Sequence, residues 1–201
     1  MFYVLCLGIA VMEQNEPAVG LLIEEGVDVN EYTMTEHIYR GIKVTQGIET
    51  PLSFSARIGN LNICKLLVQA GADIAKYRNY DSNLGINDNA LSAFHMACMG
   101  GHLNVVEYFL EQDTDIDHKD DHERSPLHIA VQYTHFNMVK LLAEKGAGLD
   151  EIDAKFGLPI MTALKLEERW DIARYLIQAG CCIDVKRWSI RRRTVMDLLH
   201  R

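Results

Sequence analysis

The feature that most constrains this chain is an internal repeat. The segment from Thr50 to Gly71 aligns without a gap with the segment from Ser125 to Gly146, and both open with a hydroxyl residue, Pro and Leu. A third copy runs from Ser92 to Asp113, with aspartate where the other copies have glycine. The step from Asp113 to Gly146 is 33 residues, and the step from Gly146 to Gly180 is 34. A short unit recurring at a fixed period predicts a stack of small units, each burying its apolar face against its neighbours.

Two weaker copies extend the array at its ends. Leu5–Ala10 with Leu21 and Leu22 forms a degenerate first copy, which accounts for the apolar start of the chain. Leu158–Ala163 opens a fifth copy, and Thr194–Leu199 opens a sixth that is cut short. The sequence therefore predicts one domain over residues 1–201, with repeats near 5–30, 50–75, 92–117, 125–150 and 158–183 and a partial repeat at 194–201.

The residue chemistry within each copy predicts two helices and a loop. Thr50 followed by Pro51 suits a helix start, because the hydroxyl can cap free amides and proline is tolerated in the first turn. Paired apolar residues such as Leu66 and Leu67 give the second helix its buried face. The glycine that follows, such as Gly71, suits a left-handed helix end. The residues after it are expected to leave the helix as an extended finger.

This pattern resembles the ankyrin repeat, whose signature is T-P-L-H-x-A at a period of 33 residues. The resemblance implies an all-α solenoid of stacked helix-turn-helix units with extended hairpin fingers. It also implies a protein–protein interaction module that binds on the concave face formed by the fingers and the first helices. The resemblance therefore also implies a role as a scaffold or adaptor. The alternatives are the substrate-recognition part of a ubiquitin-ligase adaptor of SOCS or F-box type, a metal-regulated switch, and an array appended to an enzyme outside this chain.

Two insertions depart from the regular period. Residues 31–49 and 75–91 are too long for ordinary fingers, and they contain Tyr32, His37, Tyr39, Tyr77 and Tyr80. Long structured insertions in such arrays commonly map to the binding side. The alternative is that both are disordered excursions, and the sequence leaves the two interpretations open.

The net charge narrows the class of partner, and the cysteines indicate the cellular compartment. The formal net charge of −8 argues against a general binder of nucleic acid or membrane surfaces. The basic stretch from Lys186 to Arg193 resembles a nuclear-import signal, although the finger of a truncated sixth repeat explains it more simply. Five cysteines without framework spacing predict reduced thiols, and with them a cytoplasmic or nuclear protein. The apolar start lacks the basic segment and the cleavage site of a signal peptide, and no window is long enough to span a membrane.

Histidines invite a metal or catalytic interpretation. His95 and His128 occupy the fourth position of the signature, where the resemblance implies that the imidazole ties neighbouring turns together; His102 and His135 are expected to do similar work. His118 and His122, with Asp117, Asp120 and Asp121, offer ligands suited to zinc. The finger register already explains that segment, so no metal and no cofactor are expected. None of the common catalytic motifs is present in the sequence, and we expect a non-enzyme.

The residues expected to contact a protein partner lie on the first helices and fingers and are not needed by the fold. Three of them, Met99, Tyr133 and Phe156, are apolar residues predicted to be exposed, which marks an interaction surface. The acidic fingers suggest a partner with basic character. The predicted contact residues are Arg57, Ile58, Met99, Asp121, His122, Arg124, Gln132, Tyr133, Lys155 and Phe156.

The two ends of the array are apolar. Met1–Leu7 opens the chain, and Met196, Leu198 and Leu199 end half a repeat. Repeat arrays need polar capping repeats for solubility. We therefore expect that the chain is a fragment or an isoform, or that further repeats or a capping segment cover one end.

Overall fold

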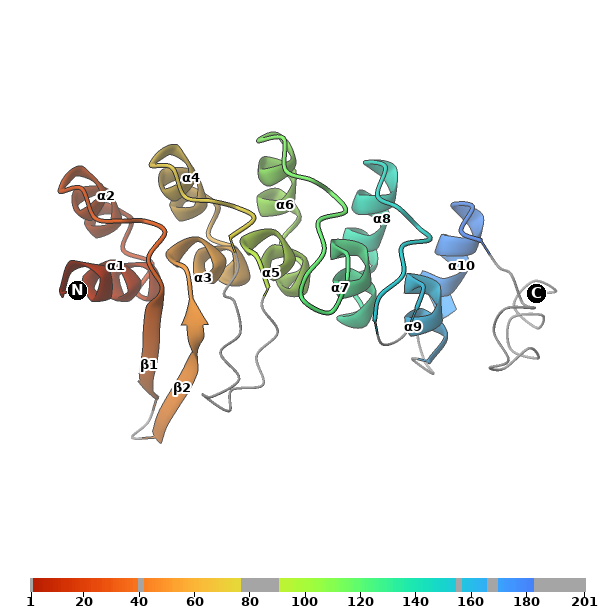
Figure 1. Cartoon of the computed structure of the whole chain (residues 1–201), viewed down its shortest axis with the longest axis horizontal. Coiled ribbons are helices and arrows are strands. Elements are labelled where there is room, and N and C mark those ends of the chain that lie inside the picture. Colours follow the sequence, from red (N-terminus) through yellow and green to blue (C-terminus); the bar gives the residue numbers. More distant parts are fainter. Residues whose placement is uncertain (1, 40–41, 77–90, 155–156, 166–169, 183–201) are drawn as a thin grey trace. The chain divides into compact units, whose positions relative to one another are not determined.

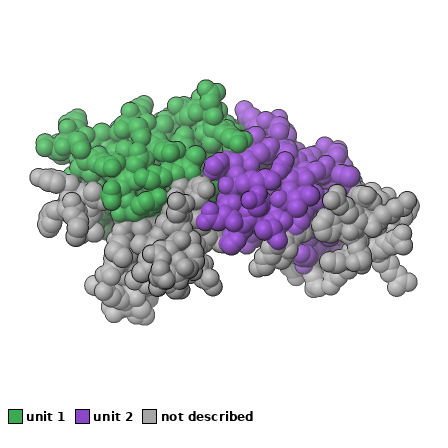
Figure 2. Space-filling view, viewed as in Figure 1, with its two compact units in different colours: residues 1–115 green, residues 116–201 purple. Residues whose placement is uncertain are grey.

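The computed structural model describes residues 2–39, 42–76, 91–154, 157–165 and 170–182 (Figure 1). The chain divides into two compact units, Met1–Asp115 and Ile116–Arg201, and each is described by itself (Figure 2). Within the described residues both units are built from pairs of short helices. None of these helices combines the length and the apolar character that a membrane crossing requires.

The first unit contains three helix pairs in two layers. The first helices form one layer, in which α1 contacts α3 and α3 contacts α5 (Figure 1). The second helices form the other layer, in which α2 contacts α4 and α4 contacts α6. The helices are α1 (Phe2–Met12), α2 (Glu16–Glu24), α3 (Pro51–Ile58), α4 (Leu61–Gln69), α5 (Ala93–Gly100) and α6 (Leu103–Leu110).

The second unit repeats this arrangement with two helix pairs among its described residues. Its first helices, α7 and α9, contact each other, and its second helices, α8 and α10, do the same. The helices are α7 (Pro126–Gln132), α8 (Phe136–Glu144), α9 (Pro159–Lys165) and α10 (Trp170–Gln178). The paired helices fall in the predicted repeats, so the predicted repeat fold of stacked helix pairs is confirmed.

The first insertion is an antiparallel β-hairpin. Strand β1 (Thr33–Tyr39) pairs with β2 (Ile42–Glu49), with Tyr39 opposite Ile42 and Thr33 opposite Glu49. The register shifts between Met34 and Glu36. The structure thus shows strand pairing in this insertion, and its place on the binding side stays a prediction. Residues 77–90, which make up most of the second insertion, lie outside the described residues.

The helix starts follow the predicted capping chemistry. The amide of Ser53 donates to the side-chain oxygen of Thr50 over 3.1 Å at the start of α3. Ser125 and His128 form a reciprocal capping box at the start of α7. Each pattern satisfies amides that the first turn of a helix leaves without a backbone partner.

The helix ends confirm the register of the repeat. Gly71 and Gly146 have φ angles of +89° and +94°, in the left-handed region that favours glycine. Asp113 has a φ of +56° and takes the same conformation. Aspartate tolerates this region better than most residues, because its short polar side chain can bond locally. The aligned position therefore keeps its backbone role without glycine.

The core runs through equivalent positions of successive repeats. Leu67, Phe109, Leu142 and Leu176 on the second helices are fully buried. The first helices α3, α5, α7 and α9 each carry a small residue at one aligned position. These four residues are also fully buried: Ser55, Ala97, Ala130 and Ala163. Small side chains let the paired helices approach closely.

Candidate functional site

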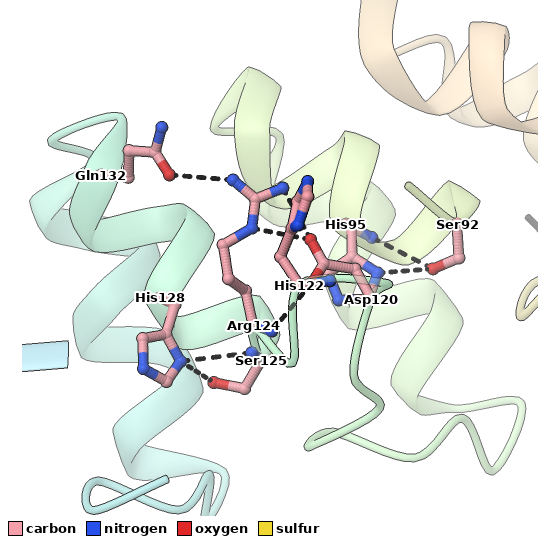
Figure 3. A network of polar contacts seen from close by, with 8 residues as sticks. All are labelled: Ser92, His95, Asp120, His122, Arg124, Ser125, His128 and Gln132. Carbon is pink, nitrogen blue, oxygen red and sulfur yellow. Dashed lines mark hydrogen bonds and ion pairs between the residues drawn. The ribbon is translucent and has the colours of Figure 1, made fainter. Parts of the chain in front are cut away.

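A finger before α7 is closed around the side chain of Asp120. Its Oδ1 accepts hydrogen bonds from the amides of His122 at 2.9 Å and Arg124 at 2.8 Å (Figure 3). The amide of Asp120 donates back to the carbonyl oxygen of Arg124 at 3.1 Å. These contacts hold residues 120–124 as a tight hairpin. Side-chain bonds from aspartate to amides two residues on are typical of such turns.

Arg124 joins this finger to the first helix. Its Nε lies 2.7 Å and its second guanidinium nitrogen 2.6 Å from Oδ2 of Asp120, and the other nitrogen donates to Oε1 of Gln132 at 3.2 Å (Figure 3). Asp120 and Arg124 are only 5% and 7% exposed. The finger itself therefore needs Arg124, contrary to the expectation that the fold does not need this residue. Two guanidinium nitrogens approach one oxygen of the Asp120 carboxylate and the third binds Gln132, so the residue positions the finger.

Four of the predicted contact residues lie on this finger or beside it at the end of α7, and all four are exposed. Asp121 and His122 lie at its tip, Gln132 ends α7, and Tyr133 follows with 41% of its surface exposed. Partial burial and the neighbouring Asp120 carboxylate raise the pKa of Asp121. The remaining two predictions for this part of the chain, Lys155 and Phe156, lie outside the described residues.

The next finger continues the same surface. The amide of Ala154 donates to the carbonyl oxygen of His122 at 3.0 Å, so the two finger tips are bonded through their backbones. Lys119 and Glu151 form an ion pair across the two fingers at 2.8 Å. Ile152 is 46% exposed. Ile152 was not among the predicted contact residues, although an isolated apolar side chain between Glu151 and Asp153 is a sequence signal for an exposed contact.

The predicted contact residues of the first unit are less exposed. Arg57, Ile58 and Met99 are all half-buried, so Met99 is less exposed than predicted. The guanidinium of Arg57 lies 4.7 Å from the centre of the Phe54 ring, and its Nε lies 3.3 Å from the Glu49 carboxylate. These two contacts hold the Arg57 side chain against its own helix and the preceding strand.

The signature histidines are structural, as predicted. The Ser125 amide donates to Nδ1 of His128 at 3.2 Å, so Nδ1 is an acceptor and Nε2 carries the proton. That Nε2 donates to the carbonyl oxygen of Gly157 at 2.8 Å in the next repeat. Burial lowers the pKa of His128. His102 ties repeats in the first unit, where its Nε2 donates to the Arg57 carbonyl oxygen at 2.9 Å.

The carboxylates considered as zinc ligands have other partners. The Gly148 amide donates to Oδ1 of Asp117 at 2.9 Å, and Asp120 is engaged by Arg124. Asp117 belongs to a repeated tie between fingers, since the Cys182 amide donates to Oδ1 of Asp150 at 2.7 Å in the same way. In the described part of the chain no three His, Cys, Asp or Glu side chains are grouped as a metal site requires.

Comparison with known protein families agrees with this geometry. A family model described as "Ankyrin repeats (3 copies)" matches residues 79–155 and 115–187, together more than half of the chain. A second model, "Ankyrin repeat", matches residues 49–80. The chain belongs to the ankyrin-repeat family. No curated protein matches it in sequence. Ankyrin repeats are generally protein–protein interaction modules and typically non-catalytic, so these ankyrin fingers are the natural place to look for a protein partner.

Proposed function

We propose that this ankyrin-repeat chain is a non-catalytic scaffold or adaptor. Its main contact surface is formed by Asp121, His122, Gln132 and Tyr133, here called the finger–helix surface. The observation that carries the proposal is Tyr133, an aromatic side chain that is 41% exposed at the end of α7. Tyrosine is enriched among the few interface residues that supply most of the binding energy. Because Tyr133 is not buried, packing within the fold does not account for an aromatic residue at this position.

Rigidity of the finger supports this choice of surface. The Asp120–Arg124 pair and the Arg124–Gln132 hydrogen bond connect the finger to α7 before any partner arrives. A surface fixed in advance loses less conformational entropy on binding than a loop that must first be ordered. The buried Asp120–Arg124 pair therefore favours tight binding without contacting the partner itself.

Charge supports a partner with a basic contact face. Asp121 and Glu123 are exposed at the tip of the finger, and Asp150 is exposed in the next one. Complementary potentials steer association and exclude partners of like charge. Lysine or arginine side chains around an apolar residue would match both the acidic tips and Tyr133. Arg57, Ile58 and Met99 in the first unit, with Lys155 and Phe156, complete the proposed contact set.

Quantitative affinity purification tests the proposal. Tagged wild type is compared with Tyr133→Ala and Gln132→Ala by mass spectrometry of the co-purified proteins. A hot-spot tyrosine contributes about 2 kcal/mol or more, which is roughly thirtyfold in affinity. We expect at least one protein with a basic contact face to be lost from both variants and retained by Lys140→Ala, which alters an exposed position of α8. Equal recovery by all four proteins would refute the assignment of this surface.

We further propose a cytoplasmic or nuclear location. All five cysteines are free thiols, and Cys64, Cys98 and Cys181 are buried. Reduced cysteines are usual in those compartments. Fractionation of cells expressing the tagged chain tests this, and its recovery from the secreted fraction would contradict it.

A further inference from the structure

An open apolar groove lies between α1 and α2. It has a volume of about 420 Å³, and both helices line it. Ile9 is 50% exposed and Leu21 is 62% exposed, and Ala10, Ala18 and Leu22 complete the apolar floor. Exposed large apolar side chains that gather in one groove mark an interaction site more often than scattered ones do.

Equivalent positions in the neighbouring repeats show what such a groove normally holds. The helix N-caps Asn15, Asn60 and His102 set the register. Six residues before them lie Ile9, Phe54 and Met96. Phe54 and Met96 are only 7% and 8% exposed, whereas Ile9 is half exposed.

Each later helix pair of the first unit packs against the pair that precedes it, since α1 contacts α3 and α2 contacts α4. Ile9 therefore lies at a position that is buried in the two later helix pairs of this unit. Among the described residues of the first unit, none covers Ile9 as Phe54 and Met96 are covered. Leu21 is likewise more exposed than Leu66 and Tyr108, the half-buried residues that lie six positions after the later N-caps.

All charged side chains of residues 2–31, the segment that forms the groove, are acidic. No lysine or arginine precedes Arg40 in the sequence. Glu13 lines the groove, and Glu24 and Glu25 are exposed at the end of α2. A second copy docking through the same face would bring these carboxylates together, because a two-fold interface pairs a patch with itself. A partner that carries positive charge beside its apolar residues suits the rim.

We propose that this groove docks an amphipathic helix of a partner protein, with an apolar stripe flanked by lysine or arginine. The apolar residues recur at a helical spacing and fill the groove against Ile9 and Leu21, as amphipathic helices do when they bind apolar grooves. The basic flanks face Glu13, Glu24 and Glu25. This surface is separate from the finger–helix surface, and its test does not depend on that proposal.

Two synthetic 18-residue helical peptides serve as probes. They share a leucine stripe, and one has lysine flanks where the other has glutamate. Fluorescence anisotropy should show saturable one-to-one binding of the lysine peptide, weakening as salt screens the charges. Ile9→Glu and Leu21→Glu should each weaken that binding about tenfold or more, even though the added carboxylate attracts lysine. Ile9→Met should retain affinity. Gln69→Glu, which adds the same charge at an exposed position outside the groove, should leave it unchanged.

A footprint places the peptide independently of these variants. Cys6 lines the groove, so in a Cys182→Ser background the lysine peptide should slow the reaction of Cys6 with a thiol reagent. Circular dichroism checks that each variant is folded. Equal binding of both peptides, or no effect of Ile9→Glu and Leu21→Glu, would overturn the proposal. Self-association in sedimentation that Ile9→Glu abolishes would also overturn it, since the face would then bind a second copy.

Discussion

His128 shows how far one side chain can be tied to a repeat. It accepts from the Ser125 amide through Nδ1 and donates to the Gly157 carbonyl oxygen through Nε2, so both ring nitrogens are used in the neutral form. Protonation would place a hydrogen on Nδ1, which faces a donor. Burial lowers the pKa of His128 below its usual value of about 6.5.

This shift predicts a pH-dependent cost for His128→Gln. Between the folded and unfolded pKa values the unfolded chain binds a proton that the folded chain does not, so acidification favours unfolding of wild type. His128→Gln should lower the free energy of unfolding by about 1–3 kcal/mol at pH 7.5. The loss should be smaller at pH 5.5, where wild type has lost part of this contribution. Urea titrations at the two pH values measure this, and a loss that is equal or larger at pH 5.5 would contradict it.

Thr134 occupies a backbone position that its neighbours give to glycine. Its φ is +61°, and the equivalent Gly59 and Gly101 have φ angles of +78° and +73°. A β-branched residue is strained in this region. Thr134→Gly should therefore raise the free energy of unfolding by about 0.5–1 kcal/mol. Thr134→Ala should raise the free energy of unfolding by less, because alanine keeps the Cβ atom that is strained at a positive φ. Denaturant midpoints test both, and destabilisation by glycine would show that the Thr134 side chain makes a compensating contact.

At the scale of single residues, the sequence predicted the features that depend only on a residue's position within the repeat. Alignment alone placed Asp113 in a left-handed glycine position, and the resemblance to ankyrin repeats implied that His128 is structural. Arg124 could not be placed that way, because its burial depends on the closed hairpin that brings the Asp120 carboxylate to its guanidinium. A position in a finger does not say whether a long side chain turns toward a partner or back onto its own loop.

At the scale of a helix, two glycines give a matched comparison. Gly20 lies within α2, and a Cβ there would meet nothing within 4 Å. Gly100 ends α5, and a Cβ there would meet the His102 ring and lie 2.8 Å from the carbonyl oxygen of Arg57. Neither has a positive φ, so alanine suits both backbones.

Gly20→Ala should raise the free energy of unfolding by about 0.5–1 kcal/mol, because alanine restricts the unfolded chain and favours helix. Gly100→Ala should lower it by about 1–3 kcal/mol, because the packed His102 must move and lose its bond to Arg57. Thermal or urea unfolding of the pair gives the answer. Stabilisation by both substitutions would mean that His102 is not held against Gly100.

Whole elements were predictable where they recur and not where they occur once. Every described helix falls in a repeat that the spacing had located. The β1–β2 hairpin had no second copy to align with, so its length showed an insertion but not its structure. Ile152 was missed for a related reason, since a variable finger position carries no signature.

At the scale of the whole molecule, the stack predicts which thiols react. Burial raises the pKa of Cys64 to about 11 and that of Cys181 to about 12, and it raises the pKa of Cys98 as well. Reaction needs an accessible thiolate. At pH 8 Cys182 and the half-buried Cys6 should react rapidly with a thiol reagent, and the other three only after denaturation. Mass spectrometry of labelled peptides locates the sites. Rapid labelling of Cys98 would contradict the packing of α5.

The most direct test of the account is photo-crosslinking from position 133. A benzoylphenylalanine replaces Tyr133 in one protein and Lys140, an exposed residue of α8, in another. Both are irradiated in cells that express the chain. The account predicts a discrete crosslinked partner from position 133 that is absent from position 140. No crosslinked partner at 133, or the same products in equal yield from both positions, would contradict the claim that this ankyrin array binds a protein on its finger–helix surface.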